Sequence, residues 1–341
     1  MRSILRPLAL LVALPLLALT ACSGNDAKDV AATPQGGTEA GAFPVTIKNK
    51  FGDTTITQAP KRIVLVGLVE QDALLALGVT PVATTEWFGD KPGALFPWAK
   101  AKLGSNAVPQ VLSDKDGIQF EKVAALQPDL IIGLYAGITA DDYKKLTAIA
   151  PTVAQLPGAP DYGVGWQDVT RTVGKAVGKP KEADDLVKGI EDRFAKVREA
   201  HPEFKGKTAL MASPYEGYFI YGSQDPRSRL LTDLGFSLPA GLDKVIGDKF
   251  GANISAEKVS LLDVGALVWF PEKGGTAKLK ADPLLKSQPV TTQGRSIYIE
   301  ENYDDDLYGA TSFVSILSLP TVLDQLVPKL ATAADGNPST N

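Results

Sequence analysis

Apolar residues in the chain follow two spacings, an alternation typical of strands and a three-to-four-residue spacing typical of helices. The alternating segment 43–56 predicts a β-hairpin with its turn at Gly52-Asp53. Further along, apolar runs predict strands at 62–67, 79–85, 130–133, 208–212, 218–221, 266–270 and 296–299. Helical spacing predicts helices at 69–77, 120–127, 141–148, 228–234 and 309–330. Strands that alternate with helices indicate an α/β fold with a mostly parallel, covered sheet.

The alternation of strands and helices occurs twice, on either side of a long helical region that runs from about Trp166 to Val177 and, after Gly178-Lys179-Pro180, from Lys181 to Ala200. The sequence Phe-Glu-Lys-Val at 120–123 precedes one predicted strand, and Ala-Glu-Lys-Val at 256–259 precedes another. We therefore expect two similar lobes. The expected domains are an N-terminal lobe at 43–160, an interdomain helix region at 161–202 and a C-terminal lobe at 203–331.

The first residues predict export followed by attachment to a membrane. Two arginines precede an apolar run at 8–19, which is too short to span a bilayer core of ~30 Å comfortably. The run ends in Leu-Thr-Ala-Cys, which matches the cleavage pattern of bacterial lipoproteins, and the alternative is an ordinary secretory signal. We expect a signal peptide at 1–21, lipidation of Cys22, a flexible tether at 22–42 and a disordered tail at 332–341. The protein would then lie on the outer face of the cell membrane, held to the bilayer through Cys22.

Composition excludes several classes of function. The net charge of −4, which becomes −6 once Arg2 and Arg6 are removed, makes nucleic acid an unfavourable partner. Cys22 is the only cysteine and His201 the only histidine, so thiolate or multi-histidine metal sites are excluded and a catalytic triad is disfavoured. Phosphate-loop, dinucleotide and nucleophile-elbow motifs are incomplete. We expect a monomeric binding protein without catalysis, resident cofactor or structural metal.

Candidate ligand-binding residues follow the predicted strands, where open α/β sheets bind ligands. Most are aromatic, which suits a bulky ligand with apolar faces and a few polar groups. The candidates are Trp87, Tyr135, Tyr215, Arg227, Arg229, Trp269 and Tyr308.

Several segments resemble the iron-siderophore periplasmic-binding family, especially its actinobacterial lipoproteins. They are 116–132, 142–146, 149–155 and the Leu-Gly-Phe at 234–236. The resemblance implies two Rossmann-like lobes joined by one rigid interdomain helix, the class III periplasmic-binding fold. It also implies the solute-binding component of an ABC importer, in which Glu121 and Glu257 dock on arginines of the permease.

The resemblance further implies that Tyr308, within Leu-Tyr-Gly-Ala-Thr at 307–311, contacts the siderophore as in ferric-hydroxamate binders. An arginine that some of those proteins use is absent, because Ser-Asp-Lys-Asp occupies 113–116. Arg227 and Arg229 are therefore the nearest candidates to meet charge on the iron complex.

The balance of charge favours one type of siderophore. The candidate cleft has few cations but has Glu70, Glu86 and the acidic run 304–306 nearby. A neutral or cationic ferric hydroxamate matches this better than a tris-catecholate with about three negative charges. A haem- or corrinoid-binding lipoprotein is the alternative, and a cell-surface adhesion lipoprotein or hydrolase is a further one. The expected partners are the ferric siderophore and the permease.

Overall fold

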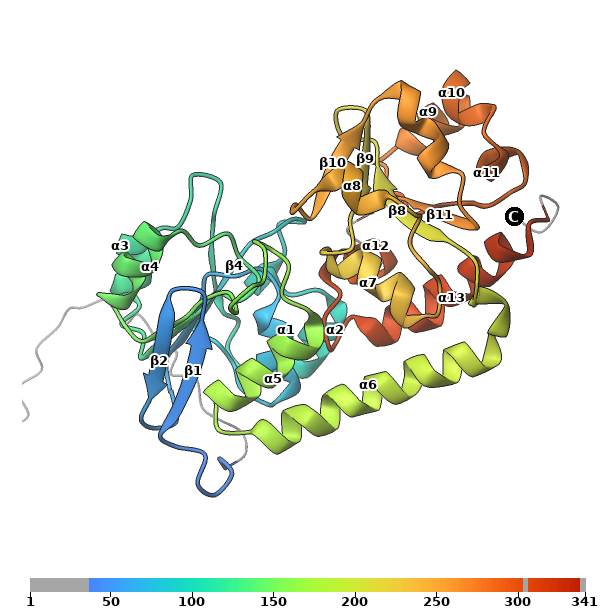
Figure 1. Ribbon diagram of the computed structural model, residues 1–341. Helices are drawn as coiled ribbons and strands as arrows, with labels where there is room; N and C mark the ends of the chain where they lie inside the picture. The colour runs from blue at the N-terminus through green and yellow to red at the C-terminus, as the bar shows by residue number, and fades with distance from the viewer. Residues whose placement is uncertain (1–36, 303–305, 338–341) are drawn as a thin grey trace, which may run out of the picture. The chain divides into compact units, whose positions relative to one another are not determined.

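The computed structural model describes residues 37–302 and 306–337, all within one compact unit (Figure 1). The predicted signal peptide, Cys22, most of the predicted tether, two residues of the acidic run and the last four residues of the chain lie outside the described residues.

The predicted hairpin is present as β1 (Val45–Asn49) and β2 (Gly52–Ile56), which pair antiparallel. Its turn is not at Gly52-Asp53, because Asp53 pairs with Lys48 within the ladder and the turn consists of Lys50 and Phe51. The reason is local: the side-chain oxygen of Asn49 accepts a hydrogen bond from the Phe51 amide at 2.9 Å, and this fixes the turn one residue after the strand.

The N-terminal lobe contains a parallel sheet in the order β5-β4-β3-β6-β7. Alternate residues of its strands enter two hydrophobic clusters. Ile63 and Leu65 pack with α1 and α5, whereas Val64 packs with α3 and α4. Both faces of the sheet are therefore covered, as short all-apolar strands require. The bounds are β3 (Ile63–Leu65), β4 (Ala83–Thr85), β5 (Gln110–Leu112), β6 (Leu130–Ile132), β7 (Thr152–Val153), α1 (Glu70–Ala76), η1 (Pro92–Ala94), α2 (Pro97–Leu103), α3 (Phe120–Ala125), α4 (Ala140–Thr147) and α5 (Trp166–Ala176).

The C-terminal lobe repeats this arrangement in the order β10-β9-β8-β11-β12. In each lobe the first strand is central, the next two lie on one side of it and the last two on the other, so the predicted duplication is confirmed. One difference is that β9 runs antiparallel to β8 and β10. The bounds are β8 (Ala209–Ser213), β9 (Tyr218–Tyr221), β10 (Gly251–Ile254), β11 (Ala266–Trp269), β12 (Ser296–Tyr298), α7 (Pro226–Asp233), α8 (Leu242–Ile246), η3 (Ala256–Leu262), α9 (Gly275–Ala281), α10 (Pro283–Lys286) and α11 (Pro289–Thr292).

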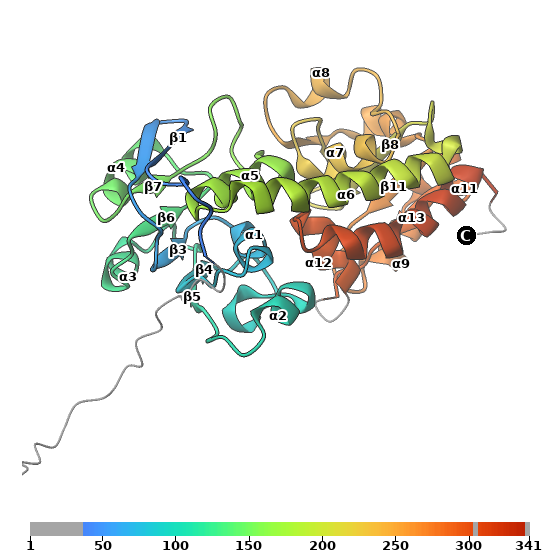
Figure 2. The ribbon, with the colours of Figure 1, turned by 90° about the horizontal axis from the view of Figure 1, so that it is seen from below.

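The predicted interdomain helix region consists of two helices with different roles. Helix α5 packs against α1 and β1 and belongs to the N-terminal lobe, whereas α6 (Pro180–Ala200) continues past it to contact α13 (Leu319–Asp335) and η2 (Pro202–Phe204) (Figure 2). The expected single connecting helix is thus α6 alone. The turn at Gly178, which has φ of 74°, separates the two helices.

The end of the predicted tether is attached to the fold. Both carboxylate oxygens of Glu39 accept hydrogen bonds from the first turn of α6, at 3.2 Å from the Lys181 amide and 3.0 Å from the Glu182 amide. A carboxylate at a helix N-terminus is stabilised by unpaired amides and by the helix dipole. The predicted tether, with its boundary at residue 42, is therefore too long by at least four residues.

The predicted helix 309–330 is divided into α12 (Asp306–Phe313) and α13 (Leu319–Asp335). Val314 has φ of 46°, and Ser315 and Ser318 exchange amide-to-hydroxyl bonds of 2.9 and 3.1 Å, which replace the helical pattern. Helix α13 also continues to Asp335, because Ala333 and Ala334 are buried in the core. The tail predicted from residue 332 is therefore helical at its start.

Candidate ligand-binding site

A pocket of about 460 Å³ lies between residues of the two lobes. Its N-terminal wall follows the carboxyl ends of β3, β4, β5 and β6, and its C-terminal wall comes from the end of β8, from β9 and from the start of α7. This is the position expected for open α/β sheets, and the volume suits a small-molecule ligand. The lining residues are Leu68, Trp87, Asp114, Tyr135, Tyr162, Ser213, Tyr215, Phe219, Tyr221, Arg227 and Phe250.

Aromatic rings form two groups of contacts in the pocket, one from each lobe. On the N-terminal side, Tyr135 contacts Trp87 and Tyr162 with ring centroids 5.8 and 5.9 Å apart. On the C-terminal side, Phe219 contacts Tyr221 and Phe250 at 5.2 and 5.7 Å. Such surfaces bind apolar faces of a ligand through a large contact area at low entropic cost.

Tyr135 is held in place by a buried carboxylate. Glu70, at the start of α1, accepts hydrogen bonds from the amides of Tyr135 at 2.7 Å and Val69 at 3.1 Å. Burial raises the pKa of Glu70, while these backbone hydrogen bonds act in the opposite direction. Gly67 makes room for the carboxylate, since a side chain there would overlap its oxygens. Glu70 therefore supports the loops after β3 and β6 and is not a charge on the pocket surface.

Arg227 brings its own counter-ion. Its guanidinium makes two hydrogen bonds of 2.8 Å to Asp225, whose side chain is 1% exposed, and it lies 4.1 Å from the ring centre of Tyr221. Burial alone would lower the pKa of Arg227, but Asp225 and the nearby phenols raise it above its ordinary value. The side chain thus stays charged and oriented, but the pair is neutral.

The structure brings four of the seven candidate ligand-binding residues together. Trp87, Tyr135, Tyr215 and Arg227 all line the pocket. Tyr215 is 63% exposed in the loop between β8 and β9, whereas Tyr135 is buried at the base. Burial raises the pKa of the Tyr135 phenol, so it remains protonated and able to donate a hydrogen bond.

The other three candidates do not line the pocket. Trp269 is 1% exposed and packs in the core of the C-terminal lobe, because alternation along β11 turns Phe270 toward the pocket side instead. Arg229 donates a 2.5 Å hydrogen bond to the Gly163 carbonyl, so it connects α7 to the segment before α5. Tyr308 contacts the rings of Phe88 and Phe270, with centroids 5.9 and 6.2 Å away.

Several lining residues are not among the candidates that the sequence suggests. Phe219 and Tyr221 lie in a predicted strand, and their two-residue spacing, which puts both side chains on one face, is the signal that could identify them. Tyr162 lies in a loop with φ of 55°, and Phe250 precedes β10, a strand that was not predicted. In the sequence, Asp114 is distinguished only by its place in the Ser-Asp-Lys-Asp stretch, where some ferric-hydroxamate binders have an arginine.

Glu121 and Glu257 occupy equivalent, exposed positions in the two lobes. Glu121 lies in the first turn of α3, which precedes β6, and Glu257 lies in the first turn of η3, which precedes β11. Within residues 37–302 and 306–337, neither carboxylate has a hydrogen-bond or ion-pair partner. Both are available to a binding partner.

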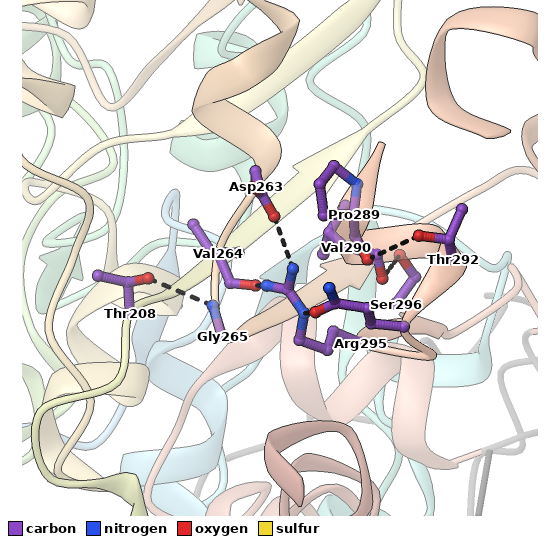
Figure 3. Close-up of polar contacts among 10 residues, drawn as sticks. Thr208, Asp263, Val264, Gly265, Pro289, Val290, Thr292, Arg295 and Ser296 are labelled. Atoms are coloured by element: carbon purple, nitrogen blue, oxygen red, sulfur yellow. Dashed lines mark hydrogen bonds and ion pairs between the residues drawn. The ribbon is translucent and has the colours of Figure 1, made fainter. Parts of the chain in front are cut away.

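An arginine secures the end of each of these helices. In the N-terminal lobe, Arg62 donates to the carbonyls of Leu126 and Gln127 at 2.8 and 3.2 Å. In the C-terminal lobe, Arg295 binds the Val264 carbonyl and the Asp263 carboxylate, the latter at 2.7 Å (Figure 3). Each arginine immediately precedes a strand that pairs with the strand after the helix. The two exposed glutamates thus lie on segments fixed in the same way.

Among the described residues, no cluster of three or more His, Cys, Asp or Glu side chains could hold a metal ion. In the same part of the chain, none of the helices combines the length and apolar character needed to span a bilayer.

Two similar α/β lobes, one connecting helix and an aromatic pocket define a solute-binding protein of the class III periplasmic fold. A family model described as periplasmic binding protein matches residues 63–303, and the chain belongs to this family. The family and fold predicted from the sequence are therefore confirmed, and the chain is a binding protein and not an enzyme.

Individual relatives and structures give the same result. The structure of a periplasmic solute binding protein from Mycobacterium smegmatis is 39% identical, covers 85% of this chain and 98% of that one, and has a TM-score of 0.74. The structure of Streptococcus pneumoniae PiaA in complex with ferrichrome is 29% identical over 86% of this chain and 99% of that one, with a TM-score of 0.75. The probable siderophore-binding lipoprotein YfiY of Bacillus subtilis is 30% identical over 68% of this chain and 70% of its own length. The chain spans 58% of the length of a further B. subtilis relative, the putative substrate-binding lipoprotein YhfQ.

Proposed function

We propose that this chain is the lipid-anchored solute-binding component of an ABC importer, and that it captures a ferric siderophore of the hydroxamate type for delivery to the permease. The observation that carries the proposal is the aromatic pocket with a single, internally neutralised arginine. Similarity to PiaA, which was crystallised with ferrichrome, and to the probable siderophore-binding protein YfiY supports it.

The charge of the pocket favours hydroxamates over catecholates. Arg227 is the only cation among the described residues that line the pocket, and Asp225 already neutralises it. A ferric tris-catecholate would bring about three negative charges into this environment with no free cation to meet them. A ferric tris-hydroxamate has a neutral iron centre and carbonyl oxygens that can accept hydrogen bonds from Arg227 and Tyr135.

Ligand titration tests this proposal. The purified chain from residue 23 onward contains the whole compact unit, and Trp87 in the pocket reports binding through its fluorescence. Ferrioxamine B should quench this fluorescence at submicromolar concentration, whereas ferric enterobactin, ferric citrate, haem and cobalamin should be at least tenfold weaker. Tighter binding of enterobactin would refute the charge argument, and a Soret shift with haem would favour the macrocycle alternative.

Delivery requires a surface that the permease recognises, and the proposal places Glu121 and Glu257 there. Their equivalent positions and open carboxylates suit two arginine-bearing sites on the permease. The double variant Glu121→Gln with Glu257→Gln should bind ferrioxamine B normally and lose uptake into cells. Glu199→Gln, an exposed glutamate on α6, is the matched control and should transport normally. Full transport by the double variant would remove these residues from docking.

The lipid anchor is tested separately, because Cys22 lies outside the described residues. Cys22→Ser should abolish labelling by radioactive palmitate and release the protein from membranes, while the affinity for ferrioxamine B stays unchanged. Retention of the label would mean that another residue carries the lipid.

A further inference from the structure

Once the counter-ion of Arg227 is included, the charged groups at the pocket sum to a net negative charge. Asp114 and Arg227 are the only charged residues among the described lining residues. The Arg227 side chain is 12% exposed, and the carboxylate of the buried Asp225 neutralises its charge. The surface presented to a ligand therefore carries the charge of Asp114 alone.

Asp114 lies at the outer part of the pocket, in the exposed loop that follows β5. Both residues line the pocket, and the charge of Asp114 acts on Tyr162: burial raises the pKa of Tyr162 most, and Asp114 raises it further. The neighbouring Asp161 also acts on Tyr162, but it is paired with Lys50 at 3.0 Å. Within the described ranges, the Asp114 carboxylate has no ion-pair or hydrogen-bond partner.

An unpaired carboxylate beside aromatic rings is a suitable site for a protonated amine. The ammonium group can form a charge-assisted hydrogen bond with the carboxylate and lie over the aromatic rings. The more buried part of the lining offers neutral donors and the neutral Arg227–Asp225 pair, which suit the iron centre.

We infer that Asp114 is a specificity-determining residue that selects ferric hydroxamates with a protonated amine over neutral ones. The inference rests on the proposed function, since it concerns the same pocket and the same ligand class. It assigns two parts of the pocket different tasks: the more buried part binds the iron centre, and the part at Asp114 distinguishes the charge of the rest of the molecule.

The test compares two ligands with the same iron centre. Ferrioxamine B carries one primary amine, which is protonated at neutral pH, and its N-acetyl derivative is neutral. The unaltered chain should bind ferrioxamine B about three- to fivefold more tightly at low ionic strength, as a partly exposed ion pair permits. The preference should shrink as salt is added, because salt screens exposed charges.

Two variants decide whether Asp114 causes the preference. Asp114→Asn should bind the two ligands equally, mainly because binding of ferrioxamine B weakens. Asp116→Asn, two residues away in the same exposed loop but not in the pocket lining, should keep the preference.

The outcomes separate this inference from the proposed function. Tight and equal binding of both ligands by the unaltered chain, or a preference that survives Asp114→Asn, would overturn the role of Asp114 and leave the proposed function standing. Equal weakening of both ligands by Asp114→Asn would also overturn it, since that is the result of a structural role. Failure of both ligands to bind the unaltered chain would overturn the proposed function and the inference together.

Discussion

Trp87 and Trp269 both follow or end a strand at the edge of a sheet where ligands bind, yet only Trp87 lines the pocket. Consecutive residues of a strand face opposite sides of the sheet, so a shift of one position decides whether Trp269 or Phe270 faces the pocket side. The sequence predicts that an aromatic residue of β11 approaches the ligand side, but the face is set by the packing of both lobes.

These two tryptophans should respond differently to substitution. Trp87→Ala removes a ring that contacts Tyr135 and should weaken ferrioxamine B binding by about 2 kcal/mol, roughly thirtyfold. Trp269→Phe should leave the affinity unchanged and lower the free energy of unfolding by about 1 to 3 kcal/mol, because it removes buried volume from the core. Fluorescence titration and urea unfolding measure the two effects. A loss of affinity in Trp269→Phe with normal stability would place Trp269 at the ligand after all.

Charge pairing was harder to predict from sequence than aromatic content. The sequence suggests that Arg227 neutralises charge on the ligand, whereas in the structure it forms an ion pair with Asp225, two residues earlier. An aspartate before proline at a helix start was a usable sign of an N-cap, and Asp225 does accept from the Arg227 amide at 2.8 Å. Its second role, as counter-ion, depends on burial that only the folded lobe creates.

At the level of elements, short apolar runs were enough to predict most central strands, because buried parallel strands are apolar on both faces. Strands β5, β7 and β10 were missed, since residues such as Gln110, Thr152 and Asn253 interrupt the apolar pattern. The break between α12 and α13 was missed because helical spacing continues across it while the Ser315–Ser318 bonds interrupt the backbone.

The segments 120–127 and 256–264, which carry the two glutamates proposed to contact the permease, provide a prediction about elements. Arg62→Gln and Arg295→Gln each remove charged hydrogen bonds to the last carbonyls after α3 and η3, which should loosen those segments at a cost of about 1 to 3 kcal/mol. The amides of 120–127 and 256–264 should exchange with solvent faster, and uptake should fall several-fold. Ferrioxamine B affinity should not change, because neither arginine lines the pocket.

Arg198→Gln is the control, because the Arg198 guanidinium binds the Asp233 carbonyl at a different helix end, and it should leave exchange in segments 120–127 and 256–264 unaltered. Normal exchange and normal uptake in the Arg62 and Arg295 variants would show that Glu121 and Glu257 need no such support.

At the level of the whole molecule, a buried carboxylate links the N-terminal lobe to the segment between α12 and α13. Asp72 in α1 accepts hydrogen bonds from Trp98 Nε1 at 2.7 Å and from the Ser315 hydroxyl, which lies between α12 and α13. Burial raises the pKa of Asp72 to about 7, against the opposite effect of these two hydrogen bonds. The sequence marks Asp72 only as a polar residue in a short helix, and its partner 243 residues away could not be predicted from local pattern.

The raised pKa of Asp72 gives stability a definite pH dependence. The folded chain keeps a proton that the unfolded chain releases near pH 4, so stability from this group is fully present below that pH and is lost as the pH rises through 7. Asp72 should therefore reduce the free energy of unfolding by about 2 kcal/mol between pH 5.5 and 8. In Asp72→Asn that part of the decrease should vanish, as measured by urea unfolding at both pH values. An identical decrease in both proteins would assign the dependence to other groups.

The hydrogen bonds between Glu39 and the first turn of α6 set the point at which the tether joins the folded part of the chain. If lipid is attached at Cys22, sixteen residues (23–38) lie between the lipidated cysteine and Glu39, and the fully extended reach of this stretch is at most about 60 Å. The protein would then stay within that distance of the bilayer and meet permeases by lateral diffusion. Its local concentration near the permease would be higher than that of a protein released into the surroundings. Loss of the Glu39 hydrogen bonds would lengthen the tether and lower the concentration of the protein next to the bilayer. A side chain far from the pocket would thereby change how often a loaded protein meets its permease.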